Sequence, residues 1–116
     1  MSTAVLFLGW NRPASGREVE AFKFLAGEGM EILGKFQKAG YFDRFDRIAL
    51  TPHCGTTNGF LLLHGDRAKL DELRRTDEFE HFSISLLRLF EGYGVVPGLN
   101  AEGLDKALER NRDLMR

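Results

Sequence analysis

The sequence is poor in cysteine and balanced in charge. A single cysteine in 116 residues excludes an intramolecular disulfide and any zinc site built from several cysteines. Sixteen Lys and Arg against seventeen Asp and Glu leave a formal net charge of −1. The basic excess typical of general nucleic-acid-binding proteins is therefore absent, and we predict no nucleic-acid partner.

Long apolar runs are also absent. The apolar segment Ala4–Trp10 spans seven residues, whereas a transmembrane helix needs about 20. No basic segment precedes it and no small-residue cleavage site follows, so it does not have the pattern of a secretory signal. We therefore predict no membrane partner and a cytoplasmic location.

What remains is the composition of a compact globular domain. Hydrophobic residues make up 43% of the chain, and ten of them are phenylalanines. A chain of this length normally forms one domain, here residues 1–116, and can bury about 65% of the surface that its unfolded form exposes. One self-made core is therefore feasible.

The pattern of apolar residues predicts alternating strands and helices. Apolar residues recur every three or four positions between Arg17 and Ala39, which predicts a helix. Ser15 and Glu18 fit a capping box at its start. Glycines at 27, 29 and 34 are unusual inside a helix and indicate tolerance, a close approach or an interruption. The other predicted elements are strands at 4–10, 45–51, 60–64 and 87–96 and a short helix at 66–75. Two further helices are predicted, one that runs to Leu86 with Thr76 as its cap and a C-terminal one capped by Asn100.

This order is β-α-β-β-α-β followed by one helix, which is the split βαβ arrangement of the α+β class. Such a chain forms an antiparallel sheet with its long helices on one face. The strands at 4–10 and 60–64 are apolar on both faces, so the uncovered face would expose an apolar patch that a monomer rarely tolerates. We therefore predict a homodimer in which two sheets pack face to face.

Several short motifs resemble those of the dimeric α/β-barrel superfamily, in which two ferredoxin-like subunits pair their sheets. The motifs are Gly9-Trp10 with Arg12 and Gly16-Arg17-Glu18, then Pro52-His53, Asn58-Gly59-Phe60 and Gly65-Asp66-Arg67. The closest likeness is to small uncharacterised bacterial members. The resemblance implies the fold and the dimer. It implies no single activity, because the superfamily includes monooxygenases, isomerases and haem proteins.

Known catalytic patterns do not fit the chain. Gly29–Lys35 has the spacing of a phosphate loop, but Phe36 replaces the magnesium-binding Ser or Thr and the segment lies in a predicted helix. The three histidines lack the spacing of a helical metal site. Cys54 has no paired base. The Asn, Trp and His of haem-degrading relatives have no counterpart, because Trp10 and Asn11 are adjacent. We therefore predict neither a metal nor a cofactor.

Six residues are candidates for ligand binding. Trp10 and Arg12 place an aromatic plane beside a cation at the end of the first strand, which suits an aromatic or carboxylate ligand. His64 and Tyr93 are expected to line the same pocket between sheet and helices, with Arg12, Arg17 or His53 at its mouth. The alternatives are a core-rim tryptophan, a backbone-bonded histidine and a tyrosine that serves packing alone.

Three functions remain open from the sequence. The first is a homodimeric domain that binds a small, partly aromatic molecule. The second is a cofactor-free monooxygenase or isomerase that uses a histidine or tyrosine of the same pocket as general base. The third is a structural or interaction protein with a filled interior. The absence of a recognisable acid–base pair favours the first function.

Overall fold

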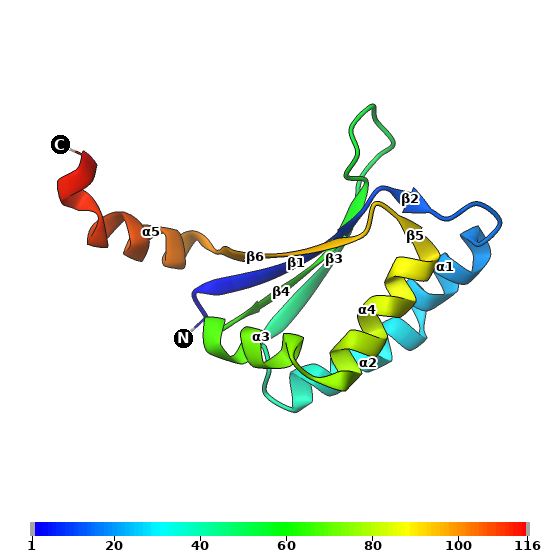
Figure 1. Ribbon diagram of the computed structural model, residues 1–116, viewed down its shortest axis with the longest axis horizontal. Coiled ribbons are helices and arrows are strands. Elements are labelled where there is room, and N and C mark those ends of the chain that lie inside the picture. The colour runs from blue at the N-terminus through cyan, green and yellow to red at the C-terminus, as the bar shows by residue number, and fades with distance from the viewer. Residues whose placement is uncertain (1, 116) are drawn as a thin grey trace.

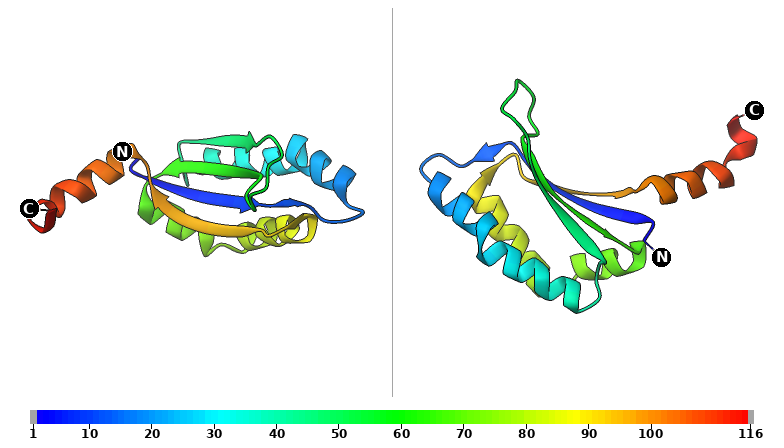
Figure 2. Two further views of the ribbon diagram at one scale, coloured as in Figure 1. Left: turned by 90° about the horizontal axis from the view of Figure 1, so that it is seen from above. Right: turned by 180° about the vertical axis from the view of Figure 1, so that it is seen from behind.

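The computed structural model describes residues 2–115. It contains a four-stranded antiparallel sheet in the order β3-β4-β1-β6, with helices on one face (Figures 1 and 2). The strands are β1 (Ala4–Trp10), β3 (Arg44–Ala49), β4 (Gly59–Gly65) and β6 (Gly94–Leu99). Two-residue strands β2 (Arg12–Pro13) and β5 (Phe90–Glu91) pair beside it. The predicted β-α-β-β-α-β order and antiparallel sheet are confirmed.

Register divides the sheet residues between two faces. Leu6 pairs with Leu63, and Leu8 pairs with Leu61, so even positions of β1 share a face with odd positions of β4. This face is closed by helices, and these four leucines are at most 1% exposed. The opposite face, which we call the open face, carries Val5, Phe7, Phe60, Leu62, His64, Asp46, Ile48 and Val96.

The helix layer consists of α1 (Glu18–Ala26), α2 (Glu28–Lys38) and α4 (Asp77–Leu89), with the shorter α3 (Arg67–Arg74) at one end (Figure 1). Phe36 and Phe82 pack edge to face in this layer, with ring centroids 6.1 Å apart. The predicted helix at 17–39 is interrupted at Gly27. Gly29 is required just after the break, because a Cβ there would lie 2.7 Å from the carbonyl oxygen of Phe24.

Helix ends follow the predicted caps in two of three cases. Thr76 Oγ1 accepts a hydrogen bond from the Phe79 amide at the start of α4. Asn100 Oδ1 accepts one from the Gly103 amide at the start of α5 (Ala101–Arg110). The predicted capping box is wrong: Arg17 is the N-cap of α1, and Glu18 accepts instead from the Gly16 amide.

The predicted strand at 87–96 also has different limits. Helix α4 continues to Leu89, and β6 runs through Pro97 to Leu99. The alternation of Leu87 and Leu89 imitates a strand, but Leu86 and Leu89 also fit the helix period and are buried. Pro97 is tolerated because β6 is an edge strand with one neighbour, β1.

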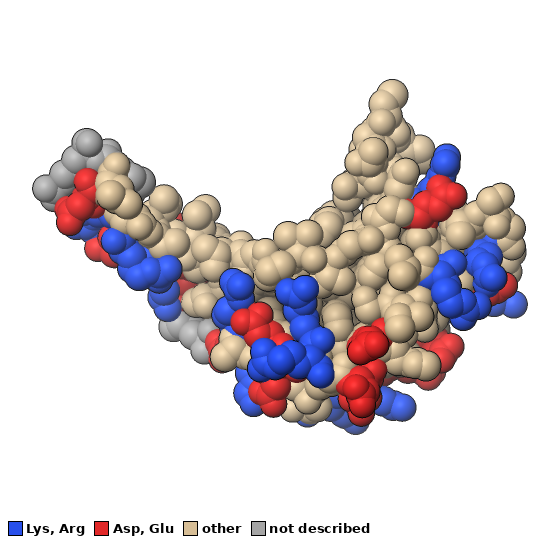
Figure 3. Space-filling model, viewed as in Figure 1, with Lys and Arg blue, Asp and Glu red and all other residues tan. Residues whose placement is uncertain are grey.

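The open face forms the floor of a concave surface. The loop between β3 and β4 (residues 50–58) rises at one end of the sheet, and α5 rises at the other (Figure 1). In Figure 3 charged side chains lie below this surface, over the helix layer and along the lower side of α5, and a further group lies beside the raised loop, outside the concave surface. Within residues 2–115, no helix has the length and apolar character needed to cross a membrane.

Candidate functional site

A cleft of about 590 Å³ lies where one end of the sheet meets α1 and the β3–β4 loop. Its apolar wall includes Phe22 and Leu25 of α1 and Leu50 and Pro52 of the loop. Its polar lining includes Asn11, Arg12, His53, Cys54 and Asn58. The volume is within the range of small-molecule sites, which is about 300–1,000 Å³.

Trp10 forms the inner end of the cleft. Its ring stacks against that of Phe90, with centroids 4.7 Å apart and planes inclined by 32°. Gly59 of β4 provides the space that the indole occupies, because a Cβ at this position would lie 2.6 Å from Trp10 Nε1. The close approach of a strand glycine therefore fixes the indole as a rigid wall of the cleft.

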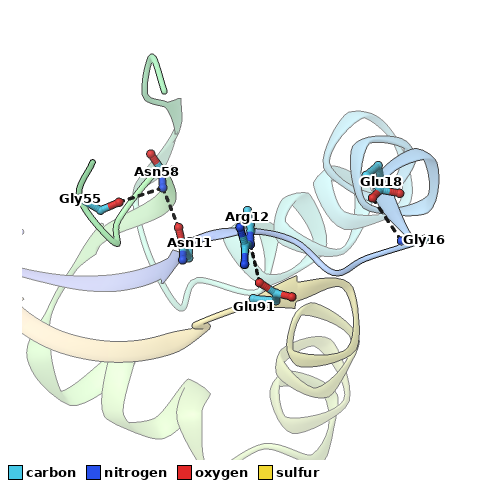
Figure 4. Close-up of polar contacts among 7 residues, drawn as sticks. All are labelled: Asn11, Arg12, Gly16, Glu18, Gly55, Asn58 and Glu91. Carbon is cyan, nitrogen blue, oxygen red and sulfur yellow. Dashed lines mark hydrogen bonds and ion pairs between the residues drawn. The ribbon is translucent and has the colours of Figure 1, made fainter. Parts of the chain in front are cut away.

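Two asparagine amides join the end of β1 to the loop. Asn58 Nδ2 donates to Asn11 Oδ1 at 2.7 Å and to the Gly55 carbonyl oxygen at 3.3 Å (Figure 4). The backbone N–H of Asn58 also donates to the backbone carbonyl oxygen of Trp10. Asn58 Oδ1 is buried and has no hydrogen-bond partner. A buried acceptor without a donor costs free energy. This oxygen is therefore a candidate to accept a hydrogen bond from a water molecule or from a ligand.

Arg12 lies on β2, which extends from the end of β1. Its Nε donates to Glu91 of β5 at 2.6 Å (Figure 4). The hydrogen bond and charge of Glu91 raise the pKa of Arg12 above its ordinary value. The side chain is exposed, so the ion pair holds the guanidinium in position and contributes little stability. Arg12 therefore provides a positioned cation at the edge of the cleft.

His53 lies in the loop, and both of its ring nitrogens are already used. Nε2 donates to the Thr57 carbonyl oxygen at 2.9 Å, and Nδ1 accepts from the Gly55 amide at 2.8 Å. These bonds make the imidazole a brace that shapes the loop. Cys54 next to it is exposed, and nothing in its surroundings marks it as an activated nucleophile.

Three of the six predicted residues, Trp10, Arg12 and His53, therefore line one cleft. The other three lie elsewhere, and the predicted pocket uniting Trp10, His64 and Tyr93 is not formed. Arg17 is the N-cap of α1 and pairs with Glu20 at 3.4 Å. Tyr93 packs beside the core, and its hydroxyl is 2.8 Å from Ser83 Oγ on α4. Burial raises the pKa of Tyr93.

His64 lies on the open face, opposite to the face that carries Trp10. It pairs in register with Val5, whereas Trp10 pairs with Gly59. His64 Nε2 lies 2.8 Å from Asp46 Oδ2. This hydrogen bond is the main cause that lowers the pKa of Asp46. Among the described residues His64 is the buried polar side chain. Its hydrogen-bond partner is a side-chain carboxylate, so it is neither the predicted pocket residue nor the backbone-bonded histidine of the alternative.

The sequence analysis did not identify the asparagine pair or the apolar wall of the cleft. The dipeptide Asn58-Gly59 is typical of a turn, and this local role explains the asparagine without any distant partner. Its hydrogen bond to Asn11, 47 positions away, therefore could not be read from the sequence. Phe22 belongs to the apolar stripe of the predicted helix, yet it is 61% exposed. An apolar residue in a stripe does not reveal whether it faces the core or a cleft at the end of the core.

Comparisons with known proteins are informative about the fold alone. No protein-family model matches the sequence, and no curated protein matches it either. A solved structure that it resembles is a dimeric protein of unknown function and ferredoxin-like fold from Bacteroides fragilis. The two are 10% identical, the match covers 84% of this chain and 96% of that one, and the TM-score is 0.51. The chain has a ferredoxin-like fold.

Proposed function

We propose that the protein is a homodimeric domain that binds a small, partly aromatic molecule in the cleft beside Trp10. The observation that carries the proposal is the cleft itself. It joins a fixed indole and apolar side chains of α1 to a positioned guanidinium and an amide pair. Predominantly apolar walls with a few fixed polar groups are typical of small-molecule sites.

The dimer is supported by the open face. Val5, Phe7, Phe60 and Leu62 are only partly buried there, and Val96 is 55% exposed. The ferredoxin-like protein from Bacteroides fragilis is described as dimeric. Face-to-face packing of two such sheets about a two-fold axis would cover both apolar faces with one surface.

Binding is favoured over catalysis by the state of the possible bases. Both nitrogens of His53 are engaged within the loop, Tyr93 is bonded to Ser83, and His64 faces away from the cleft. A general base must reach the proton that it abstracts, directly or through one water. The monooxygenase or isomerase alternative therefore has weaker support from this geometry.

Ligand binding is tested by thermal melting with a panel of small aromatic carboxylates and phenols. A compound at 100 times its Kd stabilises the folded state by about 2.7 kcal/mol. Phe22→Ala removes an exposed ring from the cleft wall and should weaken binding about tenfold. Val19→Ala is the matched control, because Val19 is equally exposed on α1 but does not line the cleft. Equal affinity of both variants and the parent chain would contradict this site.

The dimer is tested by sedimentation equilibrium at micromolar concentration. Leu62→Glu places a charge in the open face and should give a monomer, because an unpaired charge is costly to bury. Leu87→Glu makes the same change at an exposed position of the helix layer and should leave the dimer intact. A parent chain that sediments as a monomer would refute the homodimer.

A further inference from the structure

Helix α5 has a strongly two-sided surface. Leu104, Ala107 and Leu108 occupy one side, and Glu102, Asp105, Lys106, Glu109 and Arg110 occupy the other. Leu104 is 50% exposed and Leu108 is 44% exposed. The helix leaves the sheet at the end of β6 and projects beyond it (Figures 1 and 2). About half of each of these leucine side chains is therefore left uncovered by its own chain.

A helix of this length needs support from other parts of a structure. Isolated helices shorter than about 12–15 residues are marginal in water, and most helical stability comes from packing of the apolar side. Helix α5 has 10 residues, and the elements of its own chain that flank it are β6 and the short helix η1 (Arg112–Met115). Further packing is needed to hold it as a stable helix.

The base of α5 fixes the direction in which the helix projects. Asn100 donates from its amide to the Thr3 carbonyl oxygen at 3.2 Å and from Nδ2 to the Ser2 carbonyl oxygen at 2.8 Å. Gly103 lies so close to this segment that a Cβ would be 2.0 Å from the Thr3 carbonyl oxygen. These contacts set the angle between α5 and the sheet, so the helix projects in a fixed direction.

The apolar side of α5 continues the open face. In Figure 3 the charged side chains of α5 lie along its lower side, away from the concave surface. Leu104 and Leu108 lie opposite those charges on the helix, so they face the concave side. Val96 of β6 lies on the open face and is 55% exposed, whereas Leu99 pairs with Ala4 and belongs to the opposite face. The apolar side of α5 therefore borders the β6 end of the open face.

We propose that α5 packs its leucine side against the second copy of the chain, so that each subunit contacts the other through this helix as well as through the sheet. The inference rests on the homodimer proposed above and adds a second contact to it. Four strands of six or seven residues present about 400 Å² in projection, which is small beside the roughly 800 Å² that a standard interface buries on each partner. Helix α5 adds about 150 Å², more than a third of the sheet's area.

Charge also favours a second copy as the occupant. Arg44 and Asp46 lie on the open face and pair with each other at 3.2 Å, and the whole chain has a net charge of −1. Two copies therefore meet without accumulating charge of one sign. A strongly basic or acidic partner would lack an excess of opposite charge on this surface to pair with.

The double variant Leu104→Glu/Leu108→Glu tests the inference in the full chain. It should raise the dimer dissociation constant at least about tenfold. The matched control is Ile84→Glu/Leu87→Glu, which changes two exposed apolar residues of α4 in the helix layer and should leave that constant unchanged. Both variants should keep the circular-dichroism spectrum of the folded sheet. An unchanged dissociation constant for the α5 variant, with the parent chain dimeric, overturns the role of α5 and leaves the dimer standing.

Hydrogen exchange gives a second readout. In the parent dimer the amides of α5 should be protected, and the Leu62→Glu monomer should lose that protection while β1 and β4 keep theirs. Protection of α5 that is equal in the monomer would show that its own chain suffices, and it would overturn the inference. A parent chain that is monomeric at all concentrations refutes the proposed homodimer first and the inference with it.

Discussion

The two faces of the sheet differ in how completely they are used by the single chain. On the helix side, Leu6, Leu8, Leu61 and Leu63 are sealed beneath α1, α2 and α4. On the open side, Phe7 and Phe60 stack with ring centroids 5.0 Å apart, yet both rings remain partly exposed. Strands β1 and β4 carry large apolar residues in both directions, so the difference in exposure arises from what covers them. One face completes a core, and the other stays partly exposed in the single chain.

Neighbouring leucines on β4 compare the two faces directly. Leu61→Ala should lower the free energy of unfolding by about 2–5 kcal/mol, because it opens a cavity in a sealed core. Leu62→Ala should cost less than about 1.5 kcal/mol in the monomer, because part of that side chain is already exposed. Urea denaturation at several protein concentrations measures both. A cost for Leu62→Ala equal to that for Leu61→Ala would show that the open face is already a closed core.

Two strand glycines provide a smaller comparison. Gly59→Ala drives a methyl group into the indole of Trp10 and should destabilise the protein by about 1–3 kcal/mol through overpacking. Gly94→Ala meets no atom within 4 Å in the single chain, so its effect on the monomer should lie within about 0.5 kcal/mol. Thermal unfolding of the Leu62→Glu monomer carrying each substitution measures the contrast. Similar losses for both would contradict the assignment of faces.

Polar pairs on the two sides differ as well. On the helix side, Tyr93→Phe removes the hydrogen bond to Ser83 and should cost about 1 kcal/mol. Burial raises the pKa of Tyr93, so the folded state favours the protonated phenol. This contribution is fully present below the unfolded pKa near 10 and is lost as the pH rises further. Between pH 8 and 11, urea denaturation should show that the free energy of unfolding of the parent chain falls. The Tyr93→Phe variant should lack this fall.

On the open side the expected pH effect is the smallest and has the opposite direction. The hydrogen bond from His64 lowers the pKa of Asp46 below its ordinary value. Asp46 therefore contributes stability above that ordinary value, and the contribution is lost as the pH falls through the lowered pKa. His64→Ala should return the pKa of Asp46 toward its ordinary value. Carboxyl NMR titration measures this shift, and an unchanged titration would show that the pair is not formed in solution.

Local patterns in the sequence predicted most of the fold. Strand β1 was predicted with its observed limits, and the caps at Thr76 and Asn100 are confirmed. The end of α4 was missed, because Leu87 and Leu89 satisfy the period of a strand while Leu86 and Leu89 satisfy that of a helix. Packing in the helix layer, which the local sequence does not contain, decides between the two periods.

The candidate site was harder to predict because it depends on register. Alternation along β1 and β4 separates two sets of side chains in each strand, but it does not say which sets share a face. The observed pairing places Trp10 and His64 on opposite faces, so the predicted pocket could not form. Trp10, Arg12 and His53 come together instead because the β3–β4 loop folds back over the end of β1.

The break at Gly27 makes the wall of the cleft a separate short helix. Because the chain divides there, α1 is a nine-residue helix with two sides. Ala21 and Phe24 on one side are buried in the core, and Phe22 and Leu25 line the cleft. Arg47 Nη1 donates to the Leu25 carbonyl oxygen at 2.7 Å and acts as a tether at the end of α1. The short helix thus joins the cleft to the core, and a substitution at the exposed Phe22 can reshape the cleft while the buried Phe24 keeps the helix in place.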